Sequence, residues 1–180
     1  MSSELEDLRA RWAAGERPRL VPFWGPEGSE DGVGPHGLSQ WHPTAFEVGG
    51  VRYSTAEHWM MAEKARLFGD ERALVEILEA QTPARAKLLG RRVRNFDEAT
   101  WCAQRRDVVL RGNLAKFTQH AALRAYLLGT GADVLVEASP RDRIWGIGLA
   151  ADDPRAADPQ EWIGQNLLGF VLMDVRRRLA

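Results

Sequence analysis

"TAFEVGGVRYSTAEHWMMAEKARLF", residues 44–68, contains the signals of a β-hairpin followed directly by an α-helix. Apolar and polar residues alternate on both sides of the Gly-Gly pair at 49–50, a pattern typical of two short strands joined by a tight turn. Ser54 or Thr55 can then cap a helix that ends at Gly69. The stretch therefore predicts a small β-element next to helical structure, which favours the α+β class.

The rest of the chain is mostly helical, with caps, prolines and glycines at the expected helix ends. We expect further helices at 4–14, 71–80, 83–89, 98–117, 121–129 and 166–180, short strands at 19–24 and 133–139, and loops at 25–37 and 145–165. The predicted fold is a single helix-rich α+β domain over residues 19–180 with a small β-sheet or hairpin. Residues 1–18 form an N-terminal extension, and its short helix is expected to be peripheral.

The composition is that of an ordinary globular domain, with 44% apolar and 27% charged residues. The 24 Lys and Arg nearly balance the 25 Asp and Glu, so the net charge of −1 gives no global electrostatic reason to expect nucleic-acid binding. Residues 1–15 are charged throughout, unlike a signal peptide, and no window approaches the ~18 apolar residues of a membrane span. We expect a soluble, cytoplasmic protein with no membrane partner.

The sequence contains no pattern typical of a metal or dinucleotide site. The single Cys102 excludes an internal disulfide framework and a multi-cysteine zinc site. The four histidines, at 36, 42, 58 and 120, lack metal-ligand spacing. A GxG occurs at 146–148, but no strand–GxGxxG–helix unit surrounds it. We therefore expect neither a metal ion nor a cofactor.

Glu57 and Lys64 are the ionisable residues of the first helix that could perform chemistry. If Ser54 is the N-cap, Glu57 stands at the third helical position, where a glutamate completes a capping box. Lys64 follows seven residues later, within roughly 20° around the helix and about 10 Å along it. A partly buried lysine loses its proton more easily and becomes a nucleophile, but a lysine stem can also cover apolar surface. The spacing alone leaves the structural and the catalytic interpretations open.

Seven tryptophans are many for 180 residues, and tryptophan either fills cores or stacks on flat rings. Trp145 precedes a glycine, so its ring can lie beside backbone that a ligand approaches, although a core position is an equal alternative. Glu137 ends an apolar strand and Asp142 follows in a turn, where carboxylates serve sites and simple turns alike.

Several motifs taken in order resemble the NADAR family, also called YbiA-like. They are "FW" at 23–24, "LSQWHPTAFEVGGVRYSTAEHWMMAEKARLF" at 38–68, "AKLLGRRVRNFDEATWCAQRRDVV" at 86–109, "LAKFTQHAALRAYLLGTG" at 114–131, "LVEASPRDRIWGIGL" at 135–149 and "WIGQNLLGFVLMDVR" at 162–176. The resemblance implies a hydrolase acting on N-glycosyl bonds. Family members cleave the C–N bond of phosphoribosylamino-pyrimidine intermediates of riboflavin biosynthesis, and others remove ADP-ribose from guanine.

The resemblance also implies which residues form the site. It identifies Glu57 and Lys64 as catalytic and assigns substrate binding to Phe23, Trp24, Trp41, Trp101, Glu137, Trp145, Gly146 and Asn166. The chain departs from the family pattern at two places. Ser39-Gln40-Trp41 stands where the family usually has Ser-Asn-aromatic, and Ile147 replaces the aspartate found in members that act on riboflavin intermediates.

The implied mechanism has two routes. Glycoside hydrolysis develops positive charge at the anomeric carbon, which Glu57 can stabilise or attack with an oriented water. Lys64 can instead form a Schiff base with the opened ribose, the route that the resemblance favours. Trp101 and Trp145 are expected to lie in one pocket around a small nucleotide-like substrate or ADP-ribosylated nucleic acid. The alternatives are a non-catalytic NAD or ADP-ribose-binding module and a nucleic-acid repair factor.

Overall fold

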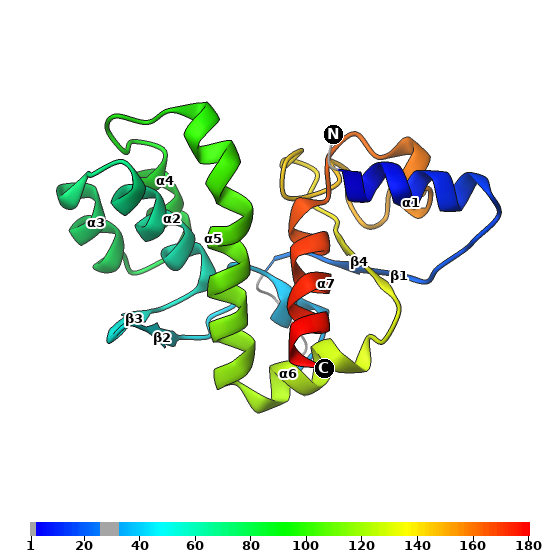
Figure 1. Ribbon diagram of the computed structural model, residues 1–180, viewed down its shortest axis with the longest axis horizontal. Helices are drawn as coiled ribbons and strands as arrows, with labels where there is room; N and C mark the ends of the chain where they lie inside the picture. The colour runs from blue at the N-terminus through cyan, green and yellow to red at the C-terminus, as the bar shows by residue number, and fades with distance from the viewer. Residues whose placement is uncertain (1–2, 26–32) are drawn as a thin grey trace. The chain divides into compact units, whose positions relative to one another are not determined.

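The computed structural model describes residues 3–25 and 33–180, and part of the loop expected at 25–37 lies outside these ranges. The contacts divide the chain into two compact units. Residues 1–39 and 122–180 make up one, called here the split unit, and residues 40–121 make up the other, the continuous unit. In Figure 1 the continuous unit is coloured from cyan to green, because its residues lie in the sequence between the two segments of the split unit.

The split unit is built around a pair of parallel strands. Its elements are α1 (Ser3–Ala13), β1 (Leu20–Phe23), the 3₁₀ helix η1 (Pro35–Leu38), α6 (Ala121–Gly129, whose first residue lies in the continuous unit), β4 (Val134–Glu137), the 3₁₀ helices η2 (Pro154–Ala157) and η3 (Pro159–Glu161), and α7 (Leu167–Leu179). β1 and β4 pair in parallel, with Leu20 opposite Val134 and Phe23 opposite Glu137. Both expected strands are therefore confirmed, and they are partners.

Helix α1 is part of the core of the split unit, so the expectation of a peripheral helix is wrong. Leu5, only 1% exposed, and Leu8 pack with the strand residues Val134 and Val136 in one hydrophobic cluster. The Arg9 guanidinium also donates to the carbonyl oxygens of η3 and its C-cap at 2.8 Å. Two leucines three positions apart lie on one helix face, so this face is buried while the charged residues of the helix stay outside the core. The boundary drawn at residue 18 stays a prediction.

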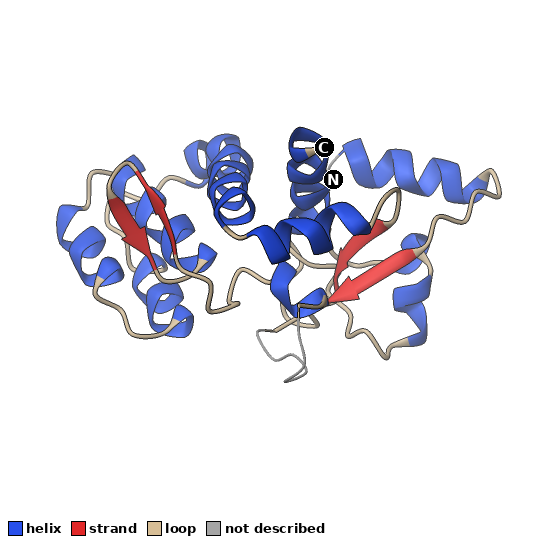
Figure 2. Ribbon diagram, turned by 90° about the horizontal axis from the view of Figure 1, so that it is seen from below, coloured by secondary structure: helices blue, strands red, loops and turns tan. Residues whose placement is uncertain are grey.

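The continuous unit begins with the hairpin and continues with four helices. Its elements are β2 (Phe46–Val48), β3 (Val51–Tyr53), α2 (Ala56–Leu67), α3 (Glu71–Leu78), α4 (Pro83–Gly90) and α5 (Glu98–Gln119). Gly49 and Gly50 have φ of 60° and 77°, values that glycine adopts without strain and that a type I′ hairpin turn requires. Figure 2 shows the two strand pairs in red, one in each unit. The expected α+β class and the hairpin are confirmed.

Helix α2 contacts α3, α4 and α5, and glycines on two of these helices allow close approach. A Cβ on Gly112 of α5 would lie 2.2 Å from Cδ1 of Trp59, and a Cβ on Gly90 of α4 would lie 2.0 Å from Sδ of Met61. The Trp59 ring also donates from Nε1 to the Val108 carbonyl at 2.7 Å. Because α2 is enclosed in this way, its polar residues are held in a rigid setting.

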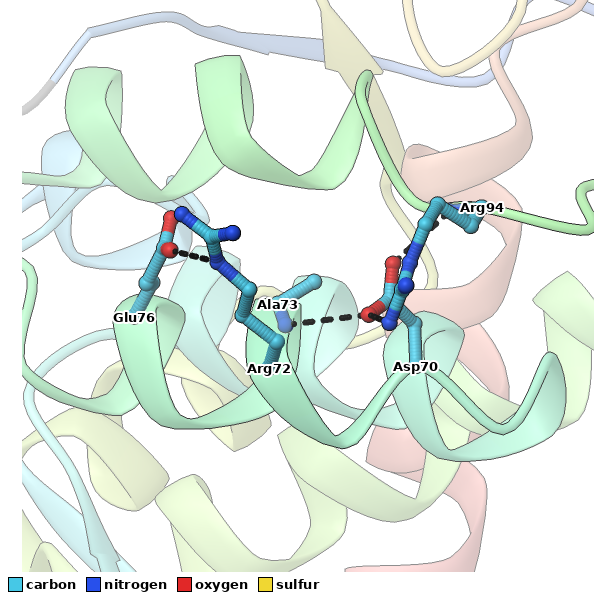
Figure 3. A network of polar contacts seen from close by, with 5 residues as sticks. All are labelled: Asp70, Arg72, Ala73, Glu76 and Arg94. Atoms are coloured by element: carbon cyan, nitrogen blue, oxygen red, sulfur yellow. Dashed lines mark hydrogen bonds and ion pairs between the residues drawn. The ribbon is translucent and has the colours of Figure 1, made fainter.

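Asp70 joins the start of α3 to the segment that precedes α5 (Figure 3). Its Oδ1 accepts from the Ala73 backbone N at 3.2 Å and from Arg94 Nη2 at 2.7 Å, and its Oδ2 accepts from the Arg94 backbone N at 2.8 Å. Hydrogen bonds from Arg94 hold the pKa of the Asp70 carboxyl below its usual range. This contact, called here the Asp70 clamp, fixes the 91–97 segment that carries Phe96.

None of the helices in residues 3–25 and 33–180 combines the length and the apolar character needed to cross a membrane.

Candidate active site

Glu57 is a buried carboxylate in the first turn of α2. The N-cap is Thr55, which accepts from the His58 backbone N, so Glu57 stands at the second helical position and not at the capping-box position. Its side chain is 2% exposed, and its Oε2 accepts a hydrogen bond from Trp41 Nε1 at 3.2 Å. The capping-box interpretation is therefore wrong. Its position in the first turn of the helix is one where the helix dipole stabilises negative charge.

Trp41 links Glu57 to a lysine that the sequence did not single out. While its indole N–H donates to Glu57, its ring lies 5.8 Å from Lys87 Nζ, measured to the ring centroid. Lys87 comes from α4 and is half-buried. The only signal in the sequence was a lysine beside an apolar pair in a short helix, which is typical of many surface helices. The structure thus groups Glu57 with an aromatic donor and a cation from another helix.

Lys64 lies in the last turn of α2 against aromatic rings. Its Nζ is 4.0 Å from the ring centroid of Phe96 and 5.6 Å from that of Trp101. Burial lowers the pKa of this amine, Glu98 opposes the shift, and Arg91 adds to it. Phe96 is held edge-on by Phe68, with centroids 5.2 Å apart, and its role was missed because it lies in a short segment between helices. Desolvation therefore favours the neutral form of this amine.

Glu57 and Lys64 belong to separate groups at opposite ends of α2. One group contains Trp41, Glu57 and Lys87, and the other contains Lys64, Phe96 and Trp101. Seven residues along a helix correspond to about 10 Å. A nucleotide-sized ligand is long enough to contact both groups.

The other six predicted residues lie in the split unit, where the parallel strands end. They are Phe23, Trp24, Glu137, Trp145, Gly146 and Asn166. The Phe23 side chain is buried in the core, whereas Trp24 directly after it is 56% exposed. Of these two aromatic side chains, Trp24 is therefore the one exposed to solvent. Ligands commonly bind at the carboxyl ends of parallel strands, so this position suits binding residues.

Asn166 positions Glu137 by pairing with the backbone of β4. The side chain is fully buried, its Oδ1 accepts from the Glu137 backbone N at 2.9 Å, and its Nδ2 donates to the Leu135 carbonyl at 2.9 Å. Asn166 itself has φ of 52°, a left-handed conformation that asparagine tolerates better than most residues. Both ends of the amide are thereby used within the protein. The predicted contact with substrate remains a prediction, and the structure gives Asn166 a positioning role.

The Trp145-Gly146 segment packs directly on the end of β4. A Cβ on Gly146 would lie 2.8 Å from the Glu137 carbonyl oxygen, so only glycine fits there. The Trp145 backbone N donates to Asp142 Oδ1 at 2.8 Å, which gives Asp142 the turn-forming role considered from the sequence. Trp145 is half-buried.

The continuous unit also contains a set of buried polar side chains that the sequence analysis did not assign to the site. Gln40, Asn113 and Lys116 are all buried, and burial lowers the pKa of Lys116 to about 7. Asn113 and Lys116 lie within a 22-residue helix, where polar residues are usually part of a solvent-exposed face. Within residues 3–25 and 33–180, no three His, Cys, Asp or Glu side chains are placed to hold a metal ion.

Comparison with known proteins assigns the chain to a family. The model of the NADAR domain matches residues 22–180. The chain belongs to the NADAR family. The resemblance drawn from the ordered motifs is thereby confirmed.

Relatives and a solved structure agree with this assignment. "N-glycosidase R617" of Acanthamoeba polyphaga mimivirus is 43% identical over 166 residues, covering 89% of this chain and 96% of that protein. "N-glycosidase YbiA" of Escherichia coli is 34% identical over 135 residues, covering 75% of this chain and 76% of that protein. The NMR structure of E. coli YbiA matches with a TM-score of 0.71 and 30% identity, over 91% of this chain and 86% of that one. This NADAR chain therefore shares the YbiA fold.

Proposed function

We propose that the protein hydrolyses the C–N glycosidic bond of a ribosylated base. It is an N-glycosidase, a hydrolase acting on N-glycosyl bonds, and its substrates are phosphoribosylamino-pyrimidines of the riboflavin pathway or ADP-ribosylated guanine. One observation carries the proposal: the buried Glu57 carboxylate, held by Trp41 at the N-terminus of α2. Similarity to relatives named N-glycosidases supports the reaction class.

Glu57 suits the charge that develops in the reaction. Breaking an N-glycosidic bond places positive charge on the anomeric carbon, and a preorganised anion stabilises that charge without rearranging water. The Trp41 N–H fixes one oxygen of the carboxylate at 3.2 Å. The carboxylate is then oriented before substrate arrives, so it can stabilise the cation or align a water molecule for attack.

Lys64 provides a covalent route to the same products. Its neutral amine attacks the anomeric carbon, the C–N bond to the base breaks, and the base leaves with a proton. The sugar ring opens to give an imine on Nζ, and one water molecule hydrolyses it to the free sugar and the amine. Burial of Lys64 supports this role, because it lowers the pKa of the amine and so favours the neutral, nucleophilic form.

The test is a mass-spectrometric search for free base. Purified protein is incubated separately with a phosphoribosylamino-pyrimidine, NAD, ADP-ribose and ADP-ribosylated guanine. Glu57→Gln should slow base release by about 10²- to 10³-fold, because the developing charge loses its counter-charge. The matched control is Glu63→Gln on the same helix, where Glu63 pairs with Arg66 and Arg111. Full activity of Glu57→Gln, or binding without base release by the wild type, would rule out this mechanism; the latter result would favour a binding module.

A further inference from the structure

The side-chain oxygen of Gln40 is buried and has no hydrogen-bond partner among the described residues. Gln40 as a whole is 7% exposed. Buried polar atoms in folded proteins nearly always have a partner, and leaving one unsatisfied is costly. The Gln40 oxygen therefore requires an explanation.

Neighbouring residues fix the orientation of the Gln40 amide. A backbone carbonyl only accepts, so the Asn113 group that contacts the Val109 oxygen at 2.9 Å must be its NH₂. The oxygen of Asn113 then faces Gln40 and receives its NH₂ at 3.2 Å. As a result, the Gln40 oxygen is turned away from Asn113.

Gln40 also lies directly beside the carboxylate group at the start of α2. Its backbone oxygen accepts from the Glu57 backbone N at 3.0 Å. The next residue, Trp41, donates to the Glu57 side chain. The segment 40–41 is thus attached to Glu57 by two hydrogen bonds, so the backbone of Gln40 is held next to the proposed catalytic residue.

We propose that the Gln40 side-chain oxygen accepts a hydrogen bond from an N–H or O–H donor of the nucleotide-like substrate. This inference rests on the proposed function and makes Gln40 a specificity-determining residue. Because the amide presents only an acceptor here, it favours an amino group on the base or a hydroxyl on the sugar. A substrate carbonyl at the same place is disfavoured, since two acceptors would then face each other.

Two pairs of probes distinguish the base from the sugar as the source of the donor. The first pair is a phosphoribosylamino-pyrimidine and its analogue lacking one ring amino group. The second pair is the same compound and its 2′-deoxyribose analogue. The wild type should prefer the donor-bearing member of one pair by about tenfold or more in kcat/KM, as expected for loss of a buried hydrogen bond. Gln40→Met, which keeps the length of the side chain, should bring that ratio close to one.

The ratio is measured within one sample, so a smaller folded fraction of the variant cancels. Gln119→Met is the matched control, because the Gln119 amide pairs with the backbone of the exposed residue Glu47 of β2. It should leave the ratio unchanged. An unchanged ratio in Gln40→Met for both pairs overturns the inference and assigns the oxygen to a buried water.

The two proposals fail in different ways. If the wild type releases no base from any probe, the proposed function is wrong, and dissociation constants for the same pairs decide the role of Gln40. A dissociation-constant ratio that collapses in Gln40→Met supports the acceptor role, whereas an equal ratio in both proteins overturns it.

Discussion

The three lysines of this chain are its most informative residues. Of 24 basic residues only Lys64, Lys87 and Lys116 are lysine, and each is half-buried or buried. Arginine stays protonated in proteins, whereas lysine can lose its proton when desolvated and then act as a nucleophile. Covalent chemistry at an amine is therefore restricted to three side chains.

Borohydride trapping should identify the reactive lysine. Reductant added during turnover is expected to leave one sugar adduct on the peptide that contains Lys64, because a Schiff base at Nζ becomes a stable amine on reduction. Lys64→Arg should abolish both the adduct and most of the activity. Lys87→Arg keeps the charge near Trp41 and should still give the Lys64 adduct. Peptide mass spectrometry is the measurement, and an adduct on Lys87 or Lys116 would contradict the assignment.

Lys116 should make stability depend on pH above neutrality. Its pKa is about 7 in the folded chain and near 10.4 in an unfolded one, so the unfolded state holds one more proton between these values. Stability then rises with pH, by up to about 1.4 kcal/mol per pH unit. The free energies of unfolding of wild type and Lys116→Met are measured in urea from pH 6.5 to 9.5. The value for the wild type should increase with pH relative to that for the variant. Parallel curves would show that Lys116 does not titrate in this window.

For single residues, the sequence indicated candidates for the site but not the contacts that they make. Glu57 and Lys64 were recognisable through family motifs. The sequence did not show whether Ser54 or Thr55 is the N-cap of the helix that contains them. That choice decides whether Glu57 completes a capping box. Gln40 was visible only as a departure from the family pattern, because its buried oxygen results from contacts 73 residues apart in the chain.

The Asp70 clamp should contribute stability that depends on acid. Its carboxyl pKa is lowered in the folded chain, so the stabilisation is complete above the ordinary aspartate pKa of about 3.9 and is lost as pH falls below it. Asp70→Asn should therefore lower the melting temperature at pH 7, and the gap to wild type should narrow toward pH 3. Calorimetry at both pH values tests this. An equal gap at both would mean that the charge of Asp70 contributes nothing.

The packing of α2 against α5 depends on Gly112. A methyl group at this position would collide with the Trp59 ring, so Gly112→Ala should cost about 1–3 kcal/mol of stability. Gly129→Ala is the control, because nothing lies within 4 Å of an added Cβ at the end of α6. Denaturant titration should show the first variant destabilised and the second close to wild type. Equal stability of the two would mean that Trp59 can move aside.

Helix boundaries were predictable because their signals are local. The helices expected at 71–80, 83–89 and 98–117 are capped by Asp70, Thr82 and Asp97, and each cap accepts a hydrogen bond from the backbone three residues later. The loop expected at 145–165 contains two 3₁₀ turns, started by Asp153 and Asp158 with proline after each. Such short turns have no periodic pattern to reveal them.

For the molecule as a whole, the remaining prediction is that Trp101 and Trp145 each contribute to binding of the substrate. Trp101 belongs to the continuous unit and Trp145 to the split unit. Binding of a nucleotide-like ligand should quench tryptophan fluorescence, and Trp101→Phe and Trp145→Phe should each remove part of the change. Trp12→Phe on α1 is the control and should leave the change intact. A quench unaffected by either site variant would contradict a substrate-binding role for these two rings.

The long-range arrangement was the least predictable part of the fold. The strand at 133–139 was recognisable as a buried apolar run. Its partner strand could not be predicted, because the pattern of a four-residue strand does not indicate which strand it pairs with. The two-unit organisation escaped prediction for the same reason. No linker marks the boundaries at 39–40 and 121–122, which fall within continuous structured chain.

Because the split unit consists of two chain segments, it can complete its folding only after the second segment has been synthesised. Leu20 of β1 emerges from the ribosome long before its partner Val134, and all of residues 40–121 are synthesised in between. We expect the continuous unit to fold first on the nascent chain. Leu5 and Leu8 stay exposed to solvent until β4 and the C-terminal segment have been synthesised. Nascent chains halted once Ala121 has left the ribosome should resist protease at 40–121 and be cut within 1–39.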